Sequence, residues 1–276
     1  MSLLSNTSSL QSSLFQRTAE CLDACDPTKK VALTQALYKD WCAGKLQIDS
    51  NFKAPEIGTV GRPEKPDLVA PREVSRRSMN TDEGRVILCH ALAHIEFNAI
   101  NLALDAVYRF NNMPEAYYAD WLKVASEEAY HYTLLESYLH KRDAKYGDFK
   151  AHNGLWEMAQ LTAHDVMIRM ALVPRVLEAR GLDVTPGILK KLAQSKDEEF
   201  IGYLEIIHRD EIGHVAIGSH WFKYLCEQRG IDYRDTFKQL IQDYMKGSLR
   251  GPFDEIARLQ AGFSADEIAD LNALEI

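Results

Sequence analysis

The sequence predicts an all-α fold, a four-helix bundle with additional helices at both ends. Long segments repeat apolar residues at intervals of three and four, the period of an amphipathic helix. No segment shows a convincing strand pattern. The helical segments also carry one polar motif twice, a glutamate followed about thirty residues later by Glu-x-x-His. Helices that project such residues toward a shared core are typical of a bundle.

Length and composition suit one large domain with extensions. The chain has 276 residues and is 46% hydrophobic, which is enough to bury a large core. We expect N-terminal helices and an extended strap over residues 1–79, the bundle over residues 80–230, and a helical extension over residues 231–276.

The charge and the cysteines indicate a cytoplasmic protein. A net charge of −8 argues against a nucleic-acid or anionic-membrane binder. No apolar run approaches the roughly 20 residues that span a bilayer, and the first 13 residues lack the basic start of a secretory signal. Five scattered cysteines without a Cys-x-x-Cys pair favour free thiols in a reducing compartment. Cys21 and Cys25, one helical turn apart, are left as a minor candidate for a soft metal.

The N-terminal part predicts two helices and a connector. Residues 13–44 read as two helices broken near Asp26-Pro27, with Gly44 as a stop. Residues 47–79 lose the helical pattern and contain six Pro or Gly punctuations, so they are too long for a simple loop. We expect either a strap across the bundle, which is the simpler reading, or a lid over its site.

The first two bundle helices come next in the chain. Asn80, with Glu83 three residues later, predicts a capped start for a helix that runs to about Phe110. A second helix is expected from about Pro114 to Lys145.

The third helix is predicted from Gly154 to Arg180, with a kink at Pro174 and a stop at Gly181. Thr185-Pro186 then begins a short helical piece. A fourth helix is expected from about Asp197 to Arg229. Residues 232–276 predict two or three more helices, one of which is opened by a capping box, Ser264-x-x-Glu267.

The repeated motif predicts a two-metal site. Residues three apart share one helix face, so a carboxylate and an imidazole can reach one ion from a single helix. The intervals nearly match, at 32 residues in the first copy and 33 in the second. Two glutamates and two Glu-x-x-His pairs are the ligand set of di-iron and di-manganese carboxylate proteins. The candidate metal-ligating and catalytic residues are Glu96, Glu128, His131, Glu178, Glu211 and His214.

Other polar residues near these helices have simpler explanations. Glu205 and His208 form a third Glu-x-x-His, but they lie on another face of the helix and are read as accidental. His90 and His94 are one turn apart and suit a metal by spacing, although polar contact with the strap or a neighbouring subunit explains them as well. Asp183 is the alternative to Glu178 as the ligand from the third helix.

Several segments resemble known proteins. The Glu-x-x-His elements resemble those of the ferritin-like superfamily, and the amino-acid sequences of several segments are similar to those of domain-of-unknown-function family 455. The ferritin-like tRNA hydroxylases are a more distant likeness. The resembling segments, spread over residues 60–225, are GRPEKPDLVAP, GRVILCHALAHIE, EEAYHY, KYGDFKAHNGLWE, RMALVPRVLEARGLD and DEIGHVAIGSHWF.

The resemblance implies a ferritin-like four-helix bundle and a role for each ligand. Glu96 and Glu178 would be terminal carboxylates, Glu128 and Glu211 would bridge the metals, and His131 and His214 would each bind one metal. Glu127 and Asp210, which precede the two Glu-x-x-His pairs, would hydrogen-bond the ligating imidazoles.

This ligand set favours two iron ions, with manganese or a mixed pair as the alternative. The leading functional hypothesis is a di-iron oxidoreductase that uses dioxygen, an unidentified small-molecule substrate and an unidentified electron donor. A homodimer is one oligomeric state that the sequence allows. The alternatives are a ferroxidase or metal-handling protein without an organic substrate, and a helical interaction protein with a vestigial site. No membrane partner is expected, and a nucleic-acid substrate is suggested only by the distant likeness.

Overall fold

The chain is all-α, as the sequence predicts, in a computed structural model that describes residues 12–49, 51–74, 79–245, 249 and 251–273. Among these residues the only strands are β1 (Ser12–Ser13) and β2 (Leu46–Gln47), which pair in parallel. The expectation of no strand is wrong for these two, because two residues are too few to show a period. Residues 1–11, most of the stretch considered for a secretory signal, lie outside the described part.

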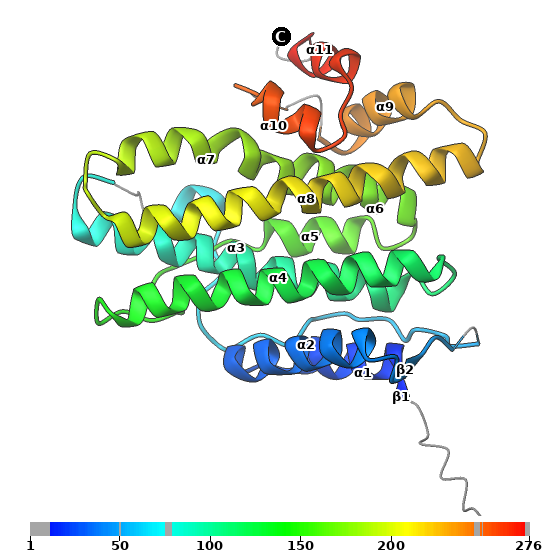
Figure 1. The fold of residues 1–276 in the computed structure, drawn as a ribbon, viewed down its shortest axis with the longest axis horizontal. Coiled ribbons are helices and arrows are strands. Elements are labelled where there is room, and N and C mark those ends of the chain that lie inside the picture. Colours follow the sequence, from blue (N-terminus) through cyan, green and yellow to red (C-terminus); the bar gives the residue numbers. More distant parts are fainter. Residues whose placement is uncertain (1–11, 50, 75–78, 246–248, 250, 274–276) are drawn as a thin grey trace, which may run out of the picture.

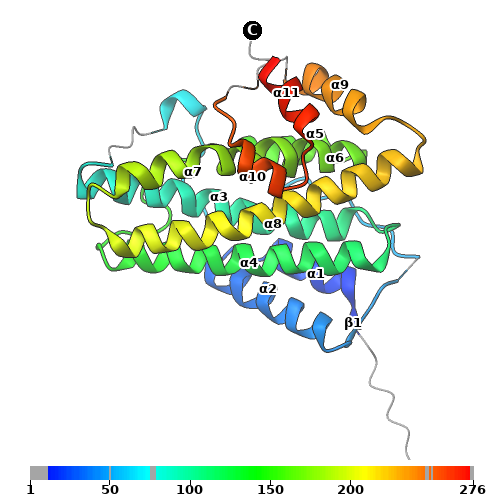
Figure 2. The ribbon, with the colours of Figure 1, turned by 45° about the horizontal axis from the view of Figure 1, so that its top comes forward.

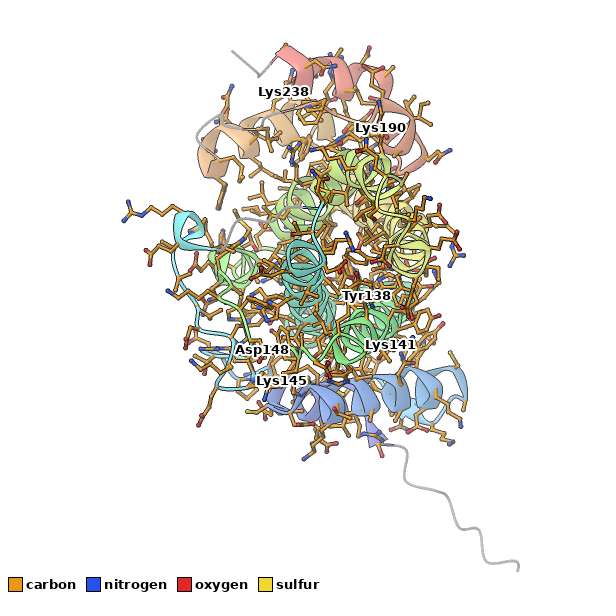
Figure 3. The ribbon with its side chains drawn as sticks, turned by 90° about the vertical axis from the view of Figure 1, so that its left-hand side faces the viewer. Tyr138, Lys141, Lys145, Asp148, Lys190 and Lys238 are labelled. Atoms are coloured by element: carbon orange, nitrogen blue, oxygen red, sulfur yellow. The ribbon has the colours of Figure 1, made fainter. Side chains whose placement is uncertain are left out.

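The helices form three layers (Figure 1). α1 (Leu14–Asp23) and α2 (Pro27–Cys42) lie on one side of the long central helices, and the C-terminal helices lie on the other side. An end-on view shows the same order (Figure 3). α1 packs on α3 and α2 packs on α4. Asp26 accepts a hydrogen bond from the Lys29 N–H at 2.7 Å, so the predicted break is a helix cap.

The central layer is built around α3 (Asp82–Arg109), α4 (Glu115–His140) and α8 (Glu198–Gln228), which lie side by side (Figures 1 and 2). α4 packs against both α3 and α8. α3 begins one residue later than predicted, because Thr81 rather than Asn80 caps it by accepting from the Gly84 N–H.

The third predicted helix begins at Gly154 as expected, but it is interrupted after Leu161 and does not end at Gly181. α5 (Gly154–Leu161) ends early, and α6 (Val166–Leu172) begins again where Asp165 accepts hydrogen bonds from two backbone N–H groups. The chain then continues through η2 (Val173–Glu178) into α7 (Ala179–Leu192). Gly181 does not stop this helix, and Pro186 lies inside it. Burial of Leu182 and Leu192 against neighbouring helices outweighs the weak helix propensity of the glycine and the proline.

The kink predicted at Pro174 takes the form of a π-helical turn. Proline lacks an N–H and its ring crowds the carbonyl four residues earlier, so the regular ladder cannot continue there. The Ala179 N–H instead donates to the Pro174 carbonyl, five residues back. A π turn rotates the following side chains relative to a continuous α-helix, and Glu178 is the last residue of this turn.

The connector is tied across the helices by hydrogen bonds of its backbone. Apart from η1 (Pro71–Glu73), its described residues form no helix and follow extended backbone with turns and bends. The Gly61 N–H donates to Leu22 O at 2.8 Å, and Gln160 Nε2 donates to Gly58 O at 2.7 Å. A Cβ on Gly61 would lie 2.4 Å from Asp23 O, so this close approach requires glycine.

The C-terminal helices dock on α8 and η2 through a buried ion pair. α9 (Tyr233–Met245), α10 (Glu255–Gln260) and α11 (Ala265–Ala273) form this layer. Arg175 of η2 pairs with Glu267, and its guanidinium lies 4.1 Å from the Phe237 ring centroid and 4.4 Å from that of Phe263. The predicted capping box is confirmed, since Ser264 and Glu267 exchange hydrogen bonds of 2.9 and 3.1 Å.

α3 is the one helix of the described residues that is long and apolar enough to cross a membrane. Its apolar window has a mean hydropathy of 1.4, contrary to the expectation that no segment approaches this limit. However, 83% of that window is buried inside the protein, as in the core helix of a soluble protein. Its length and composition are therefore explained by packing against α1, α4 and α5.

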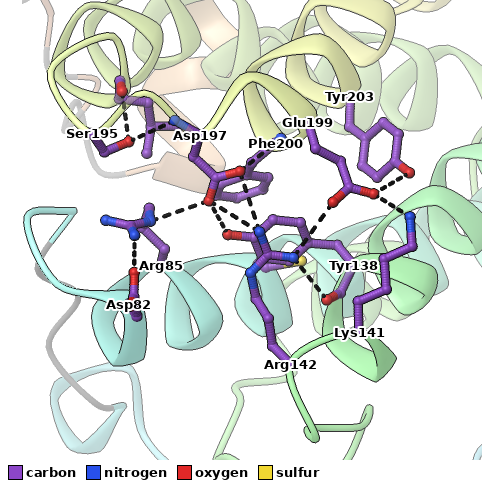
Figure 4. A network of polar contacts seen from close by, with 12 residues as sticks. Asp82, Arg85, Tyr138, Lys141, Arg142, Ser195, Asp197, Glu199, Phe200 and Tyr203 are labelled. Carbon is purple, nitrogen blue, oxygen red and sulfur yellow. Dashed lines mark hydrogen bonds and ion pairs between the residues drawn. The ribbon is translucent and has the colours of Figure 1, made fainter.

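One end of the central layer is closed by a polar network (Figure 4). Asp197, which caps α8, accepts from Tyr138 at 2.6 Å, from Arg85 at 3.2 Å and from Arg142 at 3.3 Å. Its carboxylate therefore joins α3, α4 and α8. Burial acts to raise the pKa of Asp197, but these donors and the Phe200 N–H outweigh burial and lower it below 3.8.

We expect Asp197→Asn to lower the free energy of unfolding by about 2 kcal/mol at neutral pH, because it removes the charge that three donors share. A lowered folded-state pKa stabilises the protein above the unfolded-state value and loses that contribution as the pH falls through the folded-state value. The deficit should therefore shrink below about pH 4. Urea unfolding across pH measures it, with exposed Asp82→Asn as the control that changes stability by less than about 0.5 kcal/mol. An unchanged deficit at low pH would contradict the electrostatic explanation.

Candidate metal centre

Four of the six predicted ligands form one tight cluster. One ligand atom from each lies within 4.8 Å of all the others. They come from α3, α4 and α8, and all but the last are fully or almost fully buried. The four are Glu96, Glu128, His131 and Glu211. The fold thus brings residues more than 100 positions apart to one point in the core.

His214 adjoins this cluster through α4. Its Nδ1 lies 2.9 Å from Glu128 Oε1 and 3.7 Å from Glu211 Oε1. On the other side of Glu128, His131 Nδ1 lies 3.4 Å from Oε2. Glu128 thus lies between the two imidazoles, with one oxygen near each, which is the placement a bridging carboxylate requires.

Each imidazole contacts a carboxylate through its Nε2 atom, on the side away from the cluster. His131 Nε2 lies 3.1 Å from Asp210 Oδ2, and His214 Nε2 lies 2.9 Å from Glu127 Oε2. The acid before each Glu-x-x-His pair contacts the histidine of the other helix, so α4 and α8 are joined twice. A carboxylate on Nε2 orients the ring and leaves Nδ1 directed at the cluster, as in many metal sites.

The cluster holds more acid than its histidines neutralise. Burial would lower the pKa of His131, but hydrogen bonds and negative charge from Glu128 and Glu96 raise it to about 11. Burial and the charge of Glu128 raise the pKa of Glu96 and of Glu211. Without a cation, protons therefore neutralise the cluster. A metal ion that replaced these protons would remove the cost of burying several carboxyl groups together.

Glu178 is the ligand candidate from the third helical segment. Burial raises its pKa, and the negative charges of Glu211 and Glu128 raise it further. Glu178 is not one of the four residues that form the tight cluster. The alternative, Asp183, turns away and accepts hydrogen bonds from Arg258 at 2.9 and 2.8 Å. Asp183 is therefore used to hold α10, and the geometry favours Glu178.

Four buried carboxylate oxygens in this region have no hydrogen-bond partner among the described residues. They are Oε2 of Glu96, Oε1 of Glu128, Oε2 of Glu178 and Oε2 of Glu211. A buried carboxylate oxygen without a donor is costly. Hard oxygen donors and imidazole nitrogens fit iron or manganese, so the residues present are chemically suited to these ions.

The other predicted candidates lie elsewhere. His94 contacts Tyr146 OH at 2.8 Å and His152 O at 3.0 Å, and His90 Nε2 accepts from the Gly147 N–H at 2.9 Å. These histidines therefore bind the segment between α4 and α5, which explains them without a metal. The accidental pair, Glu205 and His208, is not part of the cluster. All five cysteines are free, as expected.

Sequence reasoning missed the contact that brings α8 against the π turn. A Cβ on Gly218 of α8 would lie 2.3 Å from Pro174 Cγ and 2.4 Å from Pro174 Cβ. Only glycine permits this approach between the helix that carries Glu211 and the turn that carries Glu178. The available signal was a glycine within a long helical pattern, which often has a packing reason.

Comparison with known proteins finds a family model and a similar chain. A family model described as "Protein of unknown function (DUF455)" matches residues 23–269. An uncharacterized protein of Haemophilus influenzae is 46% identical over 265 residues, which cover 92% of each chain. No solved structure matches. The family model covers most of the chain, including the whole candidate site, and the chain therefore belongs to the DUF455 family.

Proposed function

We propose that the central helices form a ferritin-like four-helix bundle that holds two metal ions, and that the protein is a di-iron oxidoreductase acting with dioxygen on a small molecule. The four helical contributions are α3, α4, the segment from α6 to α7, and α8. The observation that carries this proposal is the cluster of Glu96, Glu128, His131 and Glu211, with His214 in contact with Glu128. Together with Glu178, these residues would make the ligand set of the di-metal carboxylate proteins.

The six residues have distinct tasks in this proposal. Glu128 lies between the two histidines, Glu211 Oε1 lies 3.7 Å from His214 Nδ1, and these two carboxylates would bridge the ions. Glu96 lies 3.2 Å from His131 Nδ1 and would bind the ion on that side, whereas Glu178 would bind the ion near His214. Bound iron ions would supply the two electrons that dioxygen reduction requires.

The centre of the cluster is shielded from solvent. Glu128, His131 and His214 have no exposed surface, so bulk water is kept away. Solvent reaches the seam between α4 and α8, where the side chains of Glu211, Asp210 and Glu127 are 13%, 17% and 29% exposed.

The first test is elemental analysis of protein expressed with iron or manganese supplied, followed by anaerobic Fe(II) loading and an optical trace during exposure to oxygen. About two irons per chain and a transient visible band are expected. Iron uptake far beyond this ratio by a large shell would favour a ferroxidase or storage role instead. Failure to bind any transition metal would contradict the proposal.

The acids that contact the two histidines, Asp210 and Glu127, should change the affinity for metal without being essential for metal binding. We expect Asp210→Ala to weaken metal affinity by about 10–100-fold, because His131 loses the partner that orients its ring. Competition with a chelator of known affinity measures this change. Arg209→Ala is the control, since Arg209 is exposed and contacts Asp210 from the solvent side. Equal losses in the two variants would contradict a role specific to the Asp210–His131 contact.

A further inference from the structure

A second polar cavity lies on the other side of α3 from the metal cluster. It has a volume of about 140 Å³ and is enclosed by the strap, α3 and α5. His94, Asn98 and Asn101 line it from α3, whereas Glu96 faces the cluster, because two residues along a helix turn the side chain by about 200°. The cavity is therefore separate from the proposed metal centre, and a ligand bound there is independent of the proposed function.

The strap forms the outer wall of this cavity and is fixed there by hydrogen bonds. Gly58 and Gly61 of the strap are tied to α5 and to the end of α1 by their hydrogen bonds with Gln160 and Leu22. Further along, the Val69 N–H donates to Ala151 O at 2.8 Å, and the Ala151 N–H donates to Asp67 O at 3.0 Å. These bonds fix the strap at both edges of the cavity.

Two lining residues carry buried polar atoms without a hydrogen-bond partner among the described residues. They are Nε1 of Trp156, whose side chain belongs to a residue 4% exposed, and Oδ1 of Asn101, which is 0% exposed. Asn101 Nδ2 already donates to Phe97 O at 3.1 Å, so its orientation is fixed and its oxygen remains free to accept. One site thus lacks an acceptor for an indole N–H and a donor for an amide oxygen.

The charge of the lining is positive. Arg62 is the only Asp, Glu, Lys or Arg among the residues that line the cavity, although the whole chain has a net charge of −8. Its guanidinium Nη1 contacts only strap carbonyls among its hydrogen bonds, those of Pro63 at 3.3 Å and Pro66 at 3.4 Å. Arg62 therefore has donors left for an anion, and a carboxylate matches its planar geometry.

From this combination we propose that the cavity between the strap and α3 binds a small organic carboxylate that also carries a hydroxyl, amino or amide donor. The carboxylate accepts from Arg62 and from Trp156 Nε1–H, and the additional donor binds Asn101 Oδ1. The volume corresponds to roughly five water molecules at about 30 Å³ each, which limits the ligand to about five to eight non-hydrogen atoms. Larger metabolites and polymers are excluded by size.

The experiment titrates the full-length protein with glycolate, L-lactate, L-alanine and oxamate while the indole N–H resonances are followed by two-dimensional NMR. The Trp156 resonance is assigned by its loss in Trp156→Phe. Propionate, which lacks the donor, and lactamide, which lacks the charge, are the matched probes for lactate. We expect a saturable shift of the Trp156 resonance with at least one hydroxy or amino carboxylate, and at least tenfold weaker binding of its matched probes.

Arg62→Gln should weaken that binding about tenfold or more, because the charged donor is lost. Arg72→Gln is the control, since Arg72 is also an exposed strap arginine but does not line the cavity. Unchanged affinity in Arg62→Gln would overturn the proposal. The absence of any saturable shift of Trp156 with the four carboxylates at millimolar concentration would also overturn it, and would leave the cavity as a site for water only.

Discussion

Glu128→Gln should abolish metal loading while the chain stays folded. Glu128 is the carboxylate between both histidines, so its loss removes one ligand oxygen from each proposed metal position. Glutamine keeps the volume of the side chain, and the core around it is not opened. We expect bound metal to fall from about two ions per chain to near zero. Elemental analysis after loading and gel filtration measures the ratio, and circular dichroism checks the fold.

His214→Ala should give the same result from the other helix, because its Nδ1 faces Glu128 and Glu211. Glu136→Gln is the matched control on α4. Glu136 lies two turns beyond Glu128 and accepts from Tyr132 OH at 3.1 Å, outside the cluster. The control should load metal like the wild type. Two ions per chain in both Glu128→Gln and His214→Ala would refute the ligand assignment.

The cluster of glutamates and histidines could be anticipated because its signal is local and repeated. A Glu-x-x-His pair places two side chains on one face whatever surrounds the helix. The apolar residues around Glu96 also indicate that its face is buried, and the structure leaves it 3% exposed. Even the acids before each pair were expected to hold the imidazoles. Their crossing between α4 and α8 was not, because it depends on how two helices pack.

The interruption and the end of the third helical segment could not be anticipated for the same reason, although its start at Gly154 was. Gly181 and Pro186 are local signals for a helix end, but tertiary packing carries α7 through both. Asp165 looked like an ordinary polar residue within one helix, although it caps a new one. Local chemistry therefore predicted the residues of the site, whereas the backbone that presents Glu178 depends on contacts distant in sequence.

Gly218→Ala tests that backbone directly, and we expect the second large effect from it. The new Cβ would lie 2.3 Å from Pro174 Cγ, a separation that real side chains do not tolerate. Pro174 is a rigid ring within the π turn, so relief requires η2 or α8 to move. Overpacking of this kind typically costs about 1–3 kcal/mol, which exceeds the roughly 0.5–1 kcal/mol that alanine gains over glycine in a helix. Urea unfolding should therefore show a net loss of stability.

The same displacement should reach the metal centre, because Glu178 ends the turn that Pro174 begins. We expect Gly218→Ala to reduce the affinity for one of the two ions while the other, held by Glu96 and His131, still binds. Gly202→Ala is the control on the same helix, since its Cβ would meet nothing within 4 Å. It should raise stability by about 0.5–1 kcal/mol through helix propensity alone. If Gly218→Ala also stabilises the protein and binds both ions normally, the close contact between α8 and the π turn does not position Glu178.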